Sequence, residues 1–280
     1  MKKLLLTCLA LTVSSLLLWW FSQAKTFTYP PMQANEQTTI KNDALRTFYL
    51  DKLLGNETIE IKSADNDILP QNPPPILALT FDDGPSQDTT PLLLAGLRER
   101  GVQVTFFILG TRAAKAPDIV LMAYEDGHAL GGHSYDHRSY FTKLNTSSLQ
   151  TQLQKTDDII ANITGEKPPI LLRPPYGAIN ASVAQQTAKA NILWSIDPRD
   201  WETRDSEIIY SYIIENAQDG GVVILHDIYP TTVEGTLKAI DKLLAKGWIF
   251  VTIPQLYEAY NIPLQAGGIY RSPHNYTLPE

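Results

Sequence analysis

Short apolar runs and longer amphipathic segments alternate along the chain from about residue 76 to residue 253. The short runs are almost wholly apolar, which is typical of strands that are buried on both faces. The longer segments carry apolar residues three and four positions apart, which predicts helices with one buried face. The predicted strands are 76–81, 104–109, 128–132 (a strand or a loop), 170–173, 192–196, 222–226 and 249–253. The predicted helices are 91–100, 117–125, 147–163, 180–189, 205–216 and 232–246.

This alternation predicts an α/β fold with a parallel sheet or barrel. Only about seven strand–helix units fit the segment, whereas a complete barrel has eight units in about 250 residues. We therefore expect a reduced barrel. The tail after Pro263 is polar and contains Gly267 and Gly268, so we expect it to be loop.

The first 24 residues have the pattern of a targeting segment. A basic start is followed by the mainly apolar run 4–21 and by small residues at Ser22 and Ala24, as in a cleaved signal peptide. The run ends in Trp19, Trp20 and Phe21, which suits an uncleaved anchor with membrane contact through residues 4–21. We favour cleavage. In both cases we expect export, to the periplasm, the medium or the outer face of the cytoplasmic membrane.

Residues 25–75 show no clear period and end in a stiff Pro-rich spacer, Pro73-Pro74-Pro75. This spacer is a natural domain boundary. The sequence therefore predicts a signal peptide or anchor (1–24), an extension with linker (25–75), the α/β domain (76–260) and a tail (261–280).

Composition narrows the function. The chain has 23 Lys and Arg against 30 Asp and Glu, a net charge of −7, which argues against binding to nucleic acid. The single Cys, Cys8, lies in the targeting segment, so no intramolecular disulfide and no cysteine zinc cluster can form. There are five His residues: His128, His133, His137, His226 and His274.

Polar groups follow the predicted strands, and the carboxyl ends of barrel strands meet at one rim. Asp82 and Asp83 end the first strand; both stay ionised only beside a cation, and the alternative is a solvated turn. His133 and His137 are spaced to grip one metal ion, and the alternative is a polar loop. Two His and one Asp form a three-ligand site with open positions, which leaves the other Asp free as a base.

Three later strand ends add candidate chemistry. Arg173 can hold an Asp ionised, although an ordinary salt bridge is the alternative. His226 ends a buried run and could be a core residue, but a pairing with Asp200 would raise its pKa and keep it protonated as an acid. Trp201 could pack a substrate or belong to the core. Because all these features fall at successive strand ends, we favour one joint site.

These residues resemble the motifs of the polysaccharide deacetylases of the NodB-homology type, carbohydrate esterase family 4. The resemblance covers about residues 75–255. The matching motifs are T-F-D-D-G-P at 80–85, H-S-x-x-H at 133–137, R-P-P-Y-G at 173–177, Asp200-Trp201, and Ile224-Leu225-His226 with Ile in place of Leu.

The resemblance implies a distorted (β/α)7 barrel, here with a short N-terminal extension, and it implies roles at the metal. Asp83, His133 and His137 would bind Zn²⁺ or another divalent transition metal such as Co²⁺. Asp82 would be the general base that activates water at the metal, with Arg173 as its partner.

The resemblance also implies how the substrate is held and protonated. The backbone N–H of Tyr176 would help to stabilise the oxyanion. His226 would be the general acid, with Asp200 as its partner, and Trp201 and Ile224 would wall the pocket for the acetyl methyl group.

Three functions follow as expectations. The first is a metal-dependent enzyme that removes N-acetyl groups from N-acetylglucosamine units of peptidoglycan or chitin. The second is an O-acetyl esterase acting on acetylated xylan or another glycan. The third is a non-catalytic glycan-binding module, which is disfavoured because no catalytic position is lost. We expect a monomer whose partner is an N-acetylated glycan.

Overall fold

The computed structural model describes residues 74–137 and 140–279. The predicted targeting segment and almost all of the extension lie outside these residues. Among the helices of the described part, none combines the length and apolar character needed to cross a bilayer.

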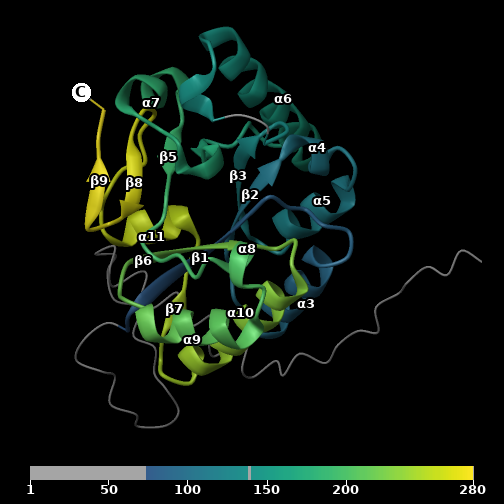
Figure 1. Ribbon diagram of the computed structural model, residues 1–280, viewed down its shortest axis with the longest axis vertical. Coiled ribbons are helices and arrows are strands. Elements are labelled where there is room, and N and C mark those ends of the chain that lie inside the picture. The colour runs from purple at the N-terminus through teal and green to yellow at the C-terminus, as the bar shows by residue number, and fades with distance from the viewer. Residues whose placement is uncertain (1–73, 138–139, 280) are drawn as a thin grey trace, which may run out of the picture. The chain divides into compact units, whose positions relative to one another are not determined.

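One sheet organises the described residues (Figure 1). Its strand order is β6-β1-β2-β3-β4-β5-β8-β9, with β7 also paired to β1, and every pairing is parallel except β8 with β9. A further parallel bridge joins Ile196, after β5, to Val223 of β6, so the sheet curls back toward its first edge. The strands are β1 (Ile76–Asp82), β2 (Thr105–Leu109), β3 (Ala129–Ser134), β4 (Leu171–Leu172), β5 (Ala190–Ile192), β6 (Gly221–His226), β7 (Ile249–Phe250), β8 (Ile269–Ser272) and β9 (Asn275–Thr277).

Helices lie around the outer side of the curled sheet (Figure 1), except the last one, whose Leu256 and Tyr257 belong to the apolar cluster inside the sheet. Polar side chains cap several of them: Asn145 and Asn180 each accept a backbone N–H at a helix start, and Thr252 forms a capping box with Gln255. The helices are α3 (Thr90–Glu99), α4 (Gly110–Ala113), α5 (Pro117–Glu125), α6 (Thr146–Thr164), α7 (Ala181–Thr187), α8 (Asp200–Thr203), α9 (Ser206–Asn216), α10 (Pro230–Leu244) and α11 (Ile253–Ala259), with 3₁₀ turns η1 (Phe141–Lys143) and η2 (Pro175–Gly177).

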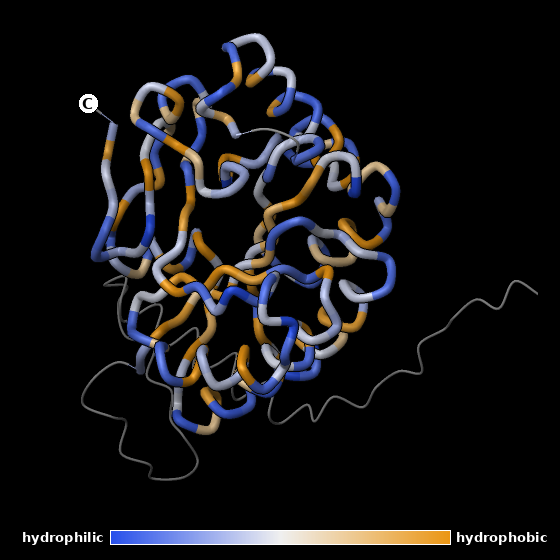
Figure 2. The backbone as a smooth tube through the Cα atoms, viewed as in Figure 1, coloured by the Kyte–Doolittle hydropathy of each residue, from blue (hydrophilic) through white to orange (hydrophobic). Residues whose placement is uncertain are grey.

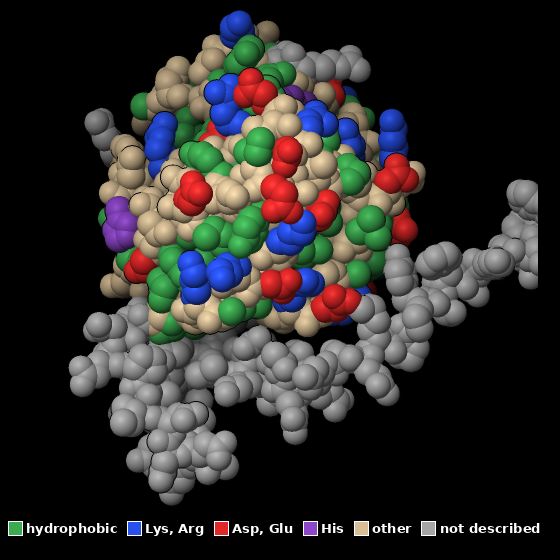
Figure 3. Space-filling model, turned by 60° about the horizontal axis from the view of Figure 1, so that its bottom comes forward, with side chains coloured by type: hydrophobic (Ala, Val, Ile, Leu, Met, Phe, Trp, Pro, Cys, Tyr) green, Lys and Arg blue, Asp and Glu red, His purple; other side chains and the backbone are tan. Residues whose placement is uncertain are grey.

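Strand β1 is buried along its whole length because it lies between two apolar layers. Leu77, Leu79 and Phe81 pack toward the helices, whereas Ile76 and Ala78 belong to a second cluster with Tyr257 and Tyr270 inside the curled sheet. Figure 2 shows the apolar stretches following the strands and the inner sides of the helices. On the face shown in Figure 3, acidic and basic side chains are interspersed.

The structure confirms the expected α/β barrel-like fold, and it corrects several strand boundaries: β3 continues to Ser134, β4 is only Leu171–Leu172, and β5 and β7 differ as follows. The strand predicted at 192–196 begins earlier, as β5 (Ala190–Ile192), because these residues pair with β4 and β8; of the later residues, Ile196 forms a single bridge to Val223. The strand predicted at 249–253 ends at Phe250, since Thr252 caps α11.

The prediction that the tail after Pro263 is loop is wrong. Strand β8 pairs in parallel with β5, and β9 folds back on β8 in antiparallel. Tyr270 drives this docking, because its ring is fully buried and contacts Tyr257 edge-on at 5.1 Å between centroids. Buried and unburied positions alternate over only four residues in β8, and β9 is exposed throughout, so the hairpin is too short to leave a readable period in the sequence.

Candidate active site

Asp82 and His226 lie side by side at the mouth of the barrel. They are the last residues of β1 and β6, and the parallel register pairs them directly. Ile76 and Ala78 face the inner cluster, so the two-residue period of the strand turns Asp82 inward as well. Asp82 is 2% exposed, and a carboxylate buried this deeply needs a charged partner.

Arg173, directly after β4, is that partner. Its fully buried guanidinium donates to Asp82 Oδ1 at 2.8 Å and to Thr80 Oγ1 at 2.7 Å. It also donates to the carbonyl oxygens of Ile192 and Leu193, so its position is fixed from several sides. Burial raises the pKa of Asp82, and the charge and hydrogen bond of Arg173 oppose that rise.

Asp83, His133 and His137 converge next to Asp82 and form a group able to hold a metal ion. His133 Nε2 and His137 Nε2 lie 3.5 Å and 3.6 Å from Asp83 Oδ1. Ligand atoms bound tetrahedrally at the usual zinc distances lie about 3.4 Å apart, so a divalent ion fits among the three side chains. Asp83 Oδ1 is buried and accepts no hydrogen bond from the described residues, which leaves its lone pairs for an ion.

The imidazole of His133 has the tautomer that metal binding requires. Its Nδ1 lies 2.7 Å from the carbonyl oxygen of Arg173. Since a carbonyl oxygen can only accept, Nδ1 carries the proton and Nε2 presents a lone pair toward Asp83. Burial lowers the pKa of His133 to about 3, so the ring is neutral at ordinary pH.

His226 and Asp200 form a second, separate pair at the same mouth. Asp200 Oδ1 lies 2.8 Å from His226 Nδ1, and Asp200 Oδ2 accepts the backbone N–H of His226 at 2.7 Å and the Thr232 hydroxyl at 2.8 Å. Burial alone would lower the pKa of His226, but the hydrogen bond and charge of Asp200, with further carboxylates nearby, raise it to about 9. His226 is therefore protonated at neutral pH, as a general acid must be.

Several site residues have a left-handed backbone. The φ angles of Asp83, His137 and Tyr176 are 71°, 60° and 60°. For residues other than glycine, this conformation costs on the order of 1 kcal/mol or more each. Strain of this kind collects where a fold enforces a functional geometry, and here it coincides with the predicted metal ligands and oxyanion donor.

The three residues predicted to contact the substrate lie at different depths. Tyr176, in η2, is 55% exposed, and Trp201, in α8, is 46% exposed. Ile224 is buried in β6, two residues before His226, so both side chains point to the same side of the strand. Their contacts with a substrate stay a prediction.

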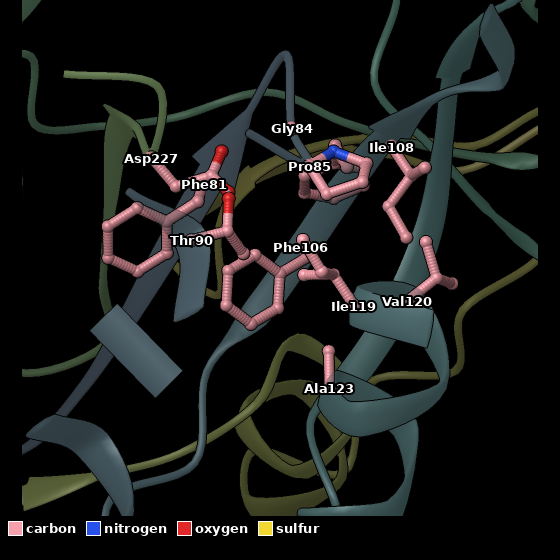
Figure 4. Close-up of a pocket in the computed structure, with 11 residues that line it drawn as sticks. Phe81, Gly84, Pro85, Thr90, Phe106, Ile108, Ile119, Val120, Ala123 and Asp227 are labelled. Atoms are coloured by element: carbon pink, nitrogen blue, oxygen red, sulfur yellow. The ribbon is translucent and has the colours of Figure 1, made fainter. Parts of the chain in front are cut away.

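Asp227, for which the sequence pattern indicates no role, is buried and packs against Gly84. Asp227 accepts a hydrogen bond from the Thr90 hydroxyl, and a Cβ atom on Gly84 would collide with its carboxyl group. Figure 4 shows Thr90 and Asp227 among the residues that line a small, mainly apolar pocket. Burial raises the pKa of Asp227 to about 7. An Asp after a buried strand gives no sequence signal that its side chain turns into the core.

Comparison with known proteins decides the family. A family model described as "Polysaccharide deacetylase" matches residues 70–193. A peptidoglycan-N-acetylglucosamine deacetylase of Bacillus cereus is 34% identical over 189 residues, which cover 65% of this chain and 87% of that protein. The chain belongs to the polysaccharide deacetylase family. This is a family of metalloenzymes, which agrees with the Asp83, His133 and His137 group.

Two further proteins are similar to this chain over about two thirds of its length. The peptidoglycan-N-acetylglucosamine deacetylase PgdA of Listeria monocytogenes is 40% identical over 181 residues, or 65% of this chain. The match spans 38% of the length of that Listeria protein. A family 4 acetyl xylan esterase from Clostridium thermocellum, solved with a cobalt ion, superposes with a TM-score of 0.66 at 25% identity and covers 70% of this chain and 98% of its own. The distorted (β/α)7 barrel predicted from the sequence is thereby confirmed.

Proposed function

We propose that this chain is a metal-dependent hydrolase that removes N-acetyl groups from N-acetylglucosamine units of a polysaccharide and releases acetate. The observation that carries the proposal is the direct pairing of Asp82 with His226 across β1 and β6, with the metal-ligand group beside them. The two peptidoglycan deacetylases among the relatives support peptidoglycan as the polymer. Chitin or chitooligosaccharide is the second candidate polymer.

Asp83, His133 and His137 would hold the metal, for which we propose Zn²⁺, with Co²⁺ as the second candidate. A divalent ion bound there would lower the pKa of a water molecule and polarise the acetamide carbonyl. One carboxylate and two imidazoles are a donor set that suits such ions and leaves coordination positions open.

In the proposed reaction Asp82 accepts a proton from the water that attacks the acetamide carbon, and Arg173 keeps the carboxylate ionised and oriented. The backbone N–H of Tyr176 donates to the carbonyl oxygen as negative charge develops on it. Trp201 and Ile224 wall the pocket that holds the acetyl methyl group.

The leaving nitrogen needs a proton before the C–N bond can break. His226, protonated and held through Nδ1 by Asp200, supplies that proton from Nε2. The products are acetate and a free amine on the sugar.

The acetyl xylan esterase among the similar structures favours a second candidate, hydrolysis of an O-acetyl ester by the same residues. An ester has a better leaving group than an amide, so an ester substrate would depend less on His226. Rates of His226→Ala on an ester and an amide substrate would separate the two functions.

We also propose that residues 1–24 direct export as a cleaved signal peptide or an anchor, and that residues 25–75 link this segment to the catalytic domain. The catalytic domain begins at residue 76, and we include β8 and β9 in it because both join the sheet. We propose that the exported enzyme is a monomer.

A substrate panel tests the proposed function. Acetate release and product mass are measured on N-acetylated chitooligosaccharides, peptidoglycan and acetylated xylan, with and without a chelator. We expect the loss of one acetyl group from each attacked amide and recovery of activity when Zn²⁺ or Co²⁺ is restored. Release that is unaffected by the chelator, or release from no glycan in the panel, would contradict the proposal.

A further inference from the structure

Two exposed tyrosines form a cluster beside the metal-ligand group. Tyr140 lies just before η1 on the chain that follows β3, and Tyr176 lies in η2 after β4. Their ring centroids are 4.4 Å apart, and the Tyr176 ring meets the His137 ring edge-on at 4.6 Å. The cluster therefore contacts His137, a predicted metal ligand, directly.

Both rings leave a large part of their apolar surface in water. Tyr176 is 55% exposed and Tyr140 is 40% exposed. Leaving apolar surface in water forgoes roughly 25 cal/mol per Å² of burial, and exposed aromatic groups at the edge of a polar site are typical of ligand-binding surfaces. Neither ring is needed to fill the described core clusters.

The cluster is also held in place before any ligand arrives. The Tyr176 hydroxyl donates to the carbonyl oxygen of His137 at 3.3 Å. The Lys143 ammonium lies over the Tyr140 ring, 4.7 Å from its centre, and this exposed side chain would move aside for a sugar to stack on that face. A surface that is ordered in advance loses less conformational entropy on binding, which favours affinity.

We propose that Tyr140 and Tyr176 form a binding platform for a pyranose ring of the glycan, namely the sugar next to the unit that loses its acetyl group. The proposal rests on the proposed function and adds a subsite to it. The C–H faces of a β-linked hexosamine are apolar and match aromatic rings, whereas the hydroxyl groups stay in water. The ligand class is an N-acetylated hexosamine oligosaccharide of at least two units.

The first test compares substrates of different length. The kcat/KM values on the monosaccharide N-acetylglucosamine, which lacks the neighbouring sugar, and on chitopentaose are measured for wild type, Tyr140→Ala, Tyr140→Phe and the control Tyr212→Ala, an exposed tyrosine on α9. Chain length should raise kcat/KM about tenfold less in Tyr140→Ala than in wild type, mainly through KM, because the ring contacts the bound sugar and not the reacting atoms. Tyr140→Phe, which keeps the ring, should stay within about twofold of wild type.

The second test measures binding without turnover. Chitopentaose binding to Asp82→Asn is compared with binding to Asp82→Asn combined with Tyr140→Ala by calorimetry, and Zn²⁺ affinity is measured for wild type and Tyr140→Ala. We expect weaker sugar binding and unchanged Zn²⁺ affinity when Tyr140 is removed.

The outcomes of the two tests are distinguishable. If Tyr140→Ala releases acetate and its kcat/KM rises with chain length as much as that of wild type, the platform is overturned and the proposed function stands. Weaker Zn²⁺ binding in Tyr140→Ala with unchanged sugar binding also overturns it, because the pair would then only support His137. Sugar binding that depends on Tyr140 without any acetate release would support the platform and overturn the proposed function.

Discussion

At the scale of single residues, the barrel mouth depends on charges that are buried and therefore tightly paired. Arg173 is the clearest case, because its fully buried guanidinium donates hydrogen bonds to Asp82, to Thr80 and to two backbone carbonyl oxygens. Removing one member of a buried ion pair leaves the other uncompensated, which is more costly than the loss of a surface pair.

Arg173→Ala should therefore lower the free energy of unfolding by about 3–5 kcal/mol. The matched control is Arg98→Ala, which breaks the surface pair of Arg98 with Asp126 and should cost about 0–1 kcal/mol. Urea denaturation of both variants checks the difference. Equal losses would show that Asp82 does not need its buried partner.

The proposed protonation of His226 can be tested through the pH dependence of activity. Its pKa of about 9 depends on Asp200, and the protonated form is the one that can act as an acid. Activity should therefore fall as pH rises through this pKa. In Asp200→Asn the charge that raises the pKa is lost, so the alkaline limb of the kcat–pH profile should move to lower pH by about one to two units, together with a lower maximum. An alkaline limb that does not move would remove Asp200 as the partner of His226.

The buried carboxyl group of Asp227 leads to a prediction about the pH dependence of stability rather than of catalysis. Burial raises its pKa to about 7 in the folded protein, so its favourable contribution is complete below about pH 4 and is lost as pH rises toward 7. Asp227→Asn stays neutral at every pH. Relative to wild type, its free energy of unfolding should improve by on the order of 2 kcal/mol between pH 5 and pH 8. Denaturant titrations at both pH values measure this, and a pH-independent difference would contradict it.

At the scale of elements, the C-terminal hairpin completes the sheet. Tyr270 of β8 is fully buried, its hydroxyl donates to Pro263 O at 2.9 Å and it accepts from Gln265 N at 2.7 Å. These hydrogen bonds go to the connection that leads from α11 to β8, so the hairpin is joined to the barrel by the packing of Tyr270 against Tyr257 and by its pairing with β5.

Tyr270→Ala should cost about 3–5 kcal/mol in the free energy of unfolding, because it leaves a large cavity beside Tyr257. Tyr212→Ala on α9 is the control, since that ring is 38% exposed and surface substitutions change stability by about 0.5 kcal/mol. Thermal or urea unfolding gives both values. A Tyr270→Ala protein as stable as the control would mean that β8 is a dispensable edge.

At the scale of the whole molecule, the sequence predicted the parallel barrel because its strands are buried on both faces and read as plain apolar runs. The metal-ligand group and the pairs Asp82–Arg173 and Asp200–His226 were predictable too, because parallel strands deliver their last residues to one rim. Tyr140, Asp227 and the hairpin of β8 and β9 were not. Their positions depend on contacts between distant segments, such as Asp227 with Gly84 or Tyr270 with Tyr257, which leave no local period.

The central claim is that Asp82 acts as a base beside a divalent ion held by Asp83, His133 and His137. It is tested most directly by acetate release from N-acetylated chitopentaose and peptidoglycan, measured by NMR for wild type, Asp82→Asn and the exposed control Asp88→Asn, each with its metal content determined. We predict that Asp82→Asn keeps its metal and loses at least about 100-fold in kcat, the usual contribution of a general base, while Asp88→Asn matches wild type. Acetate release by metal-loaded Asp82→Asn at the wild-type rate would contradict the account.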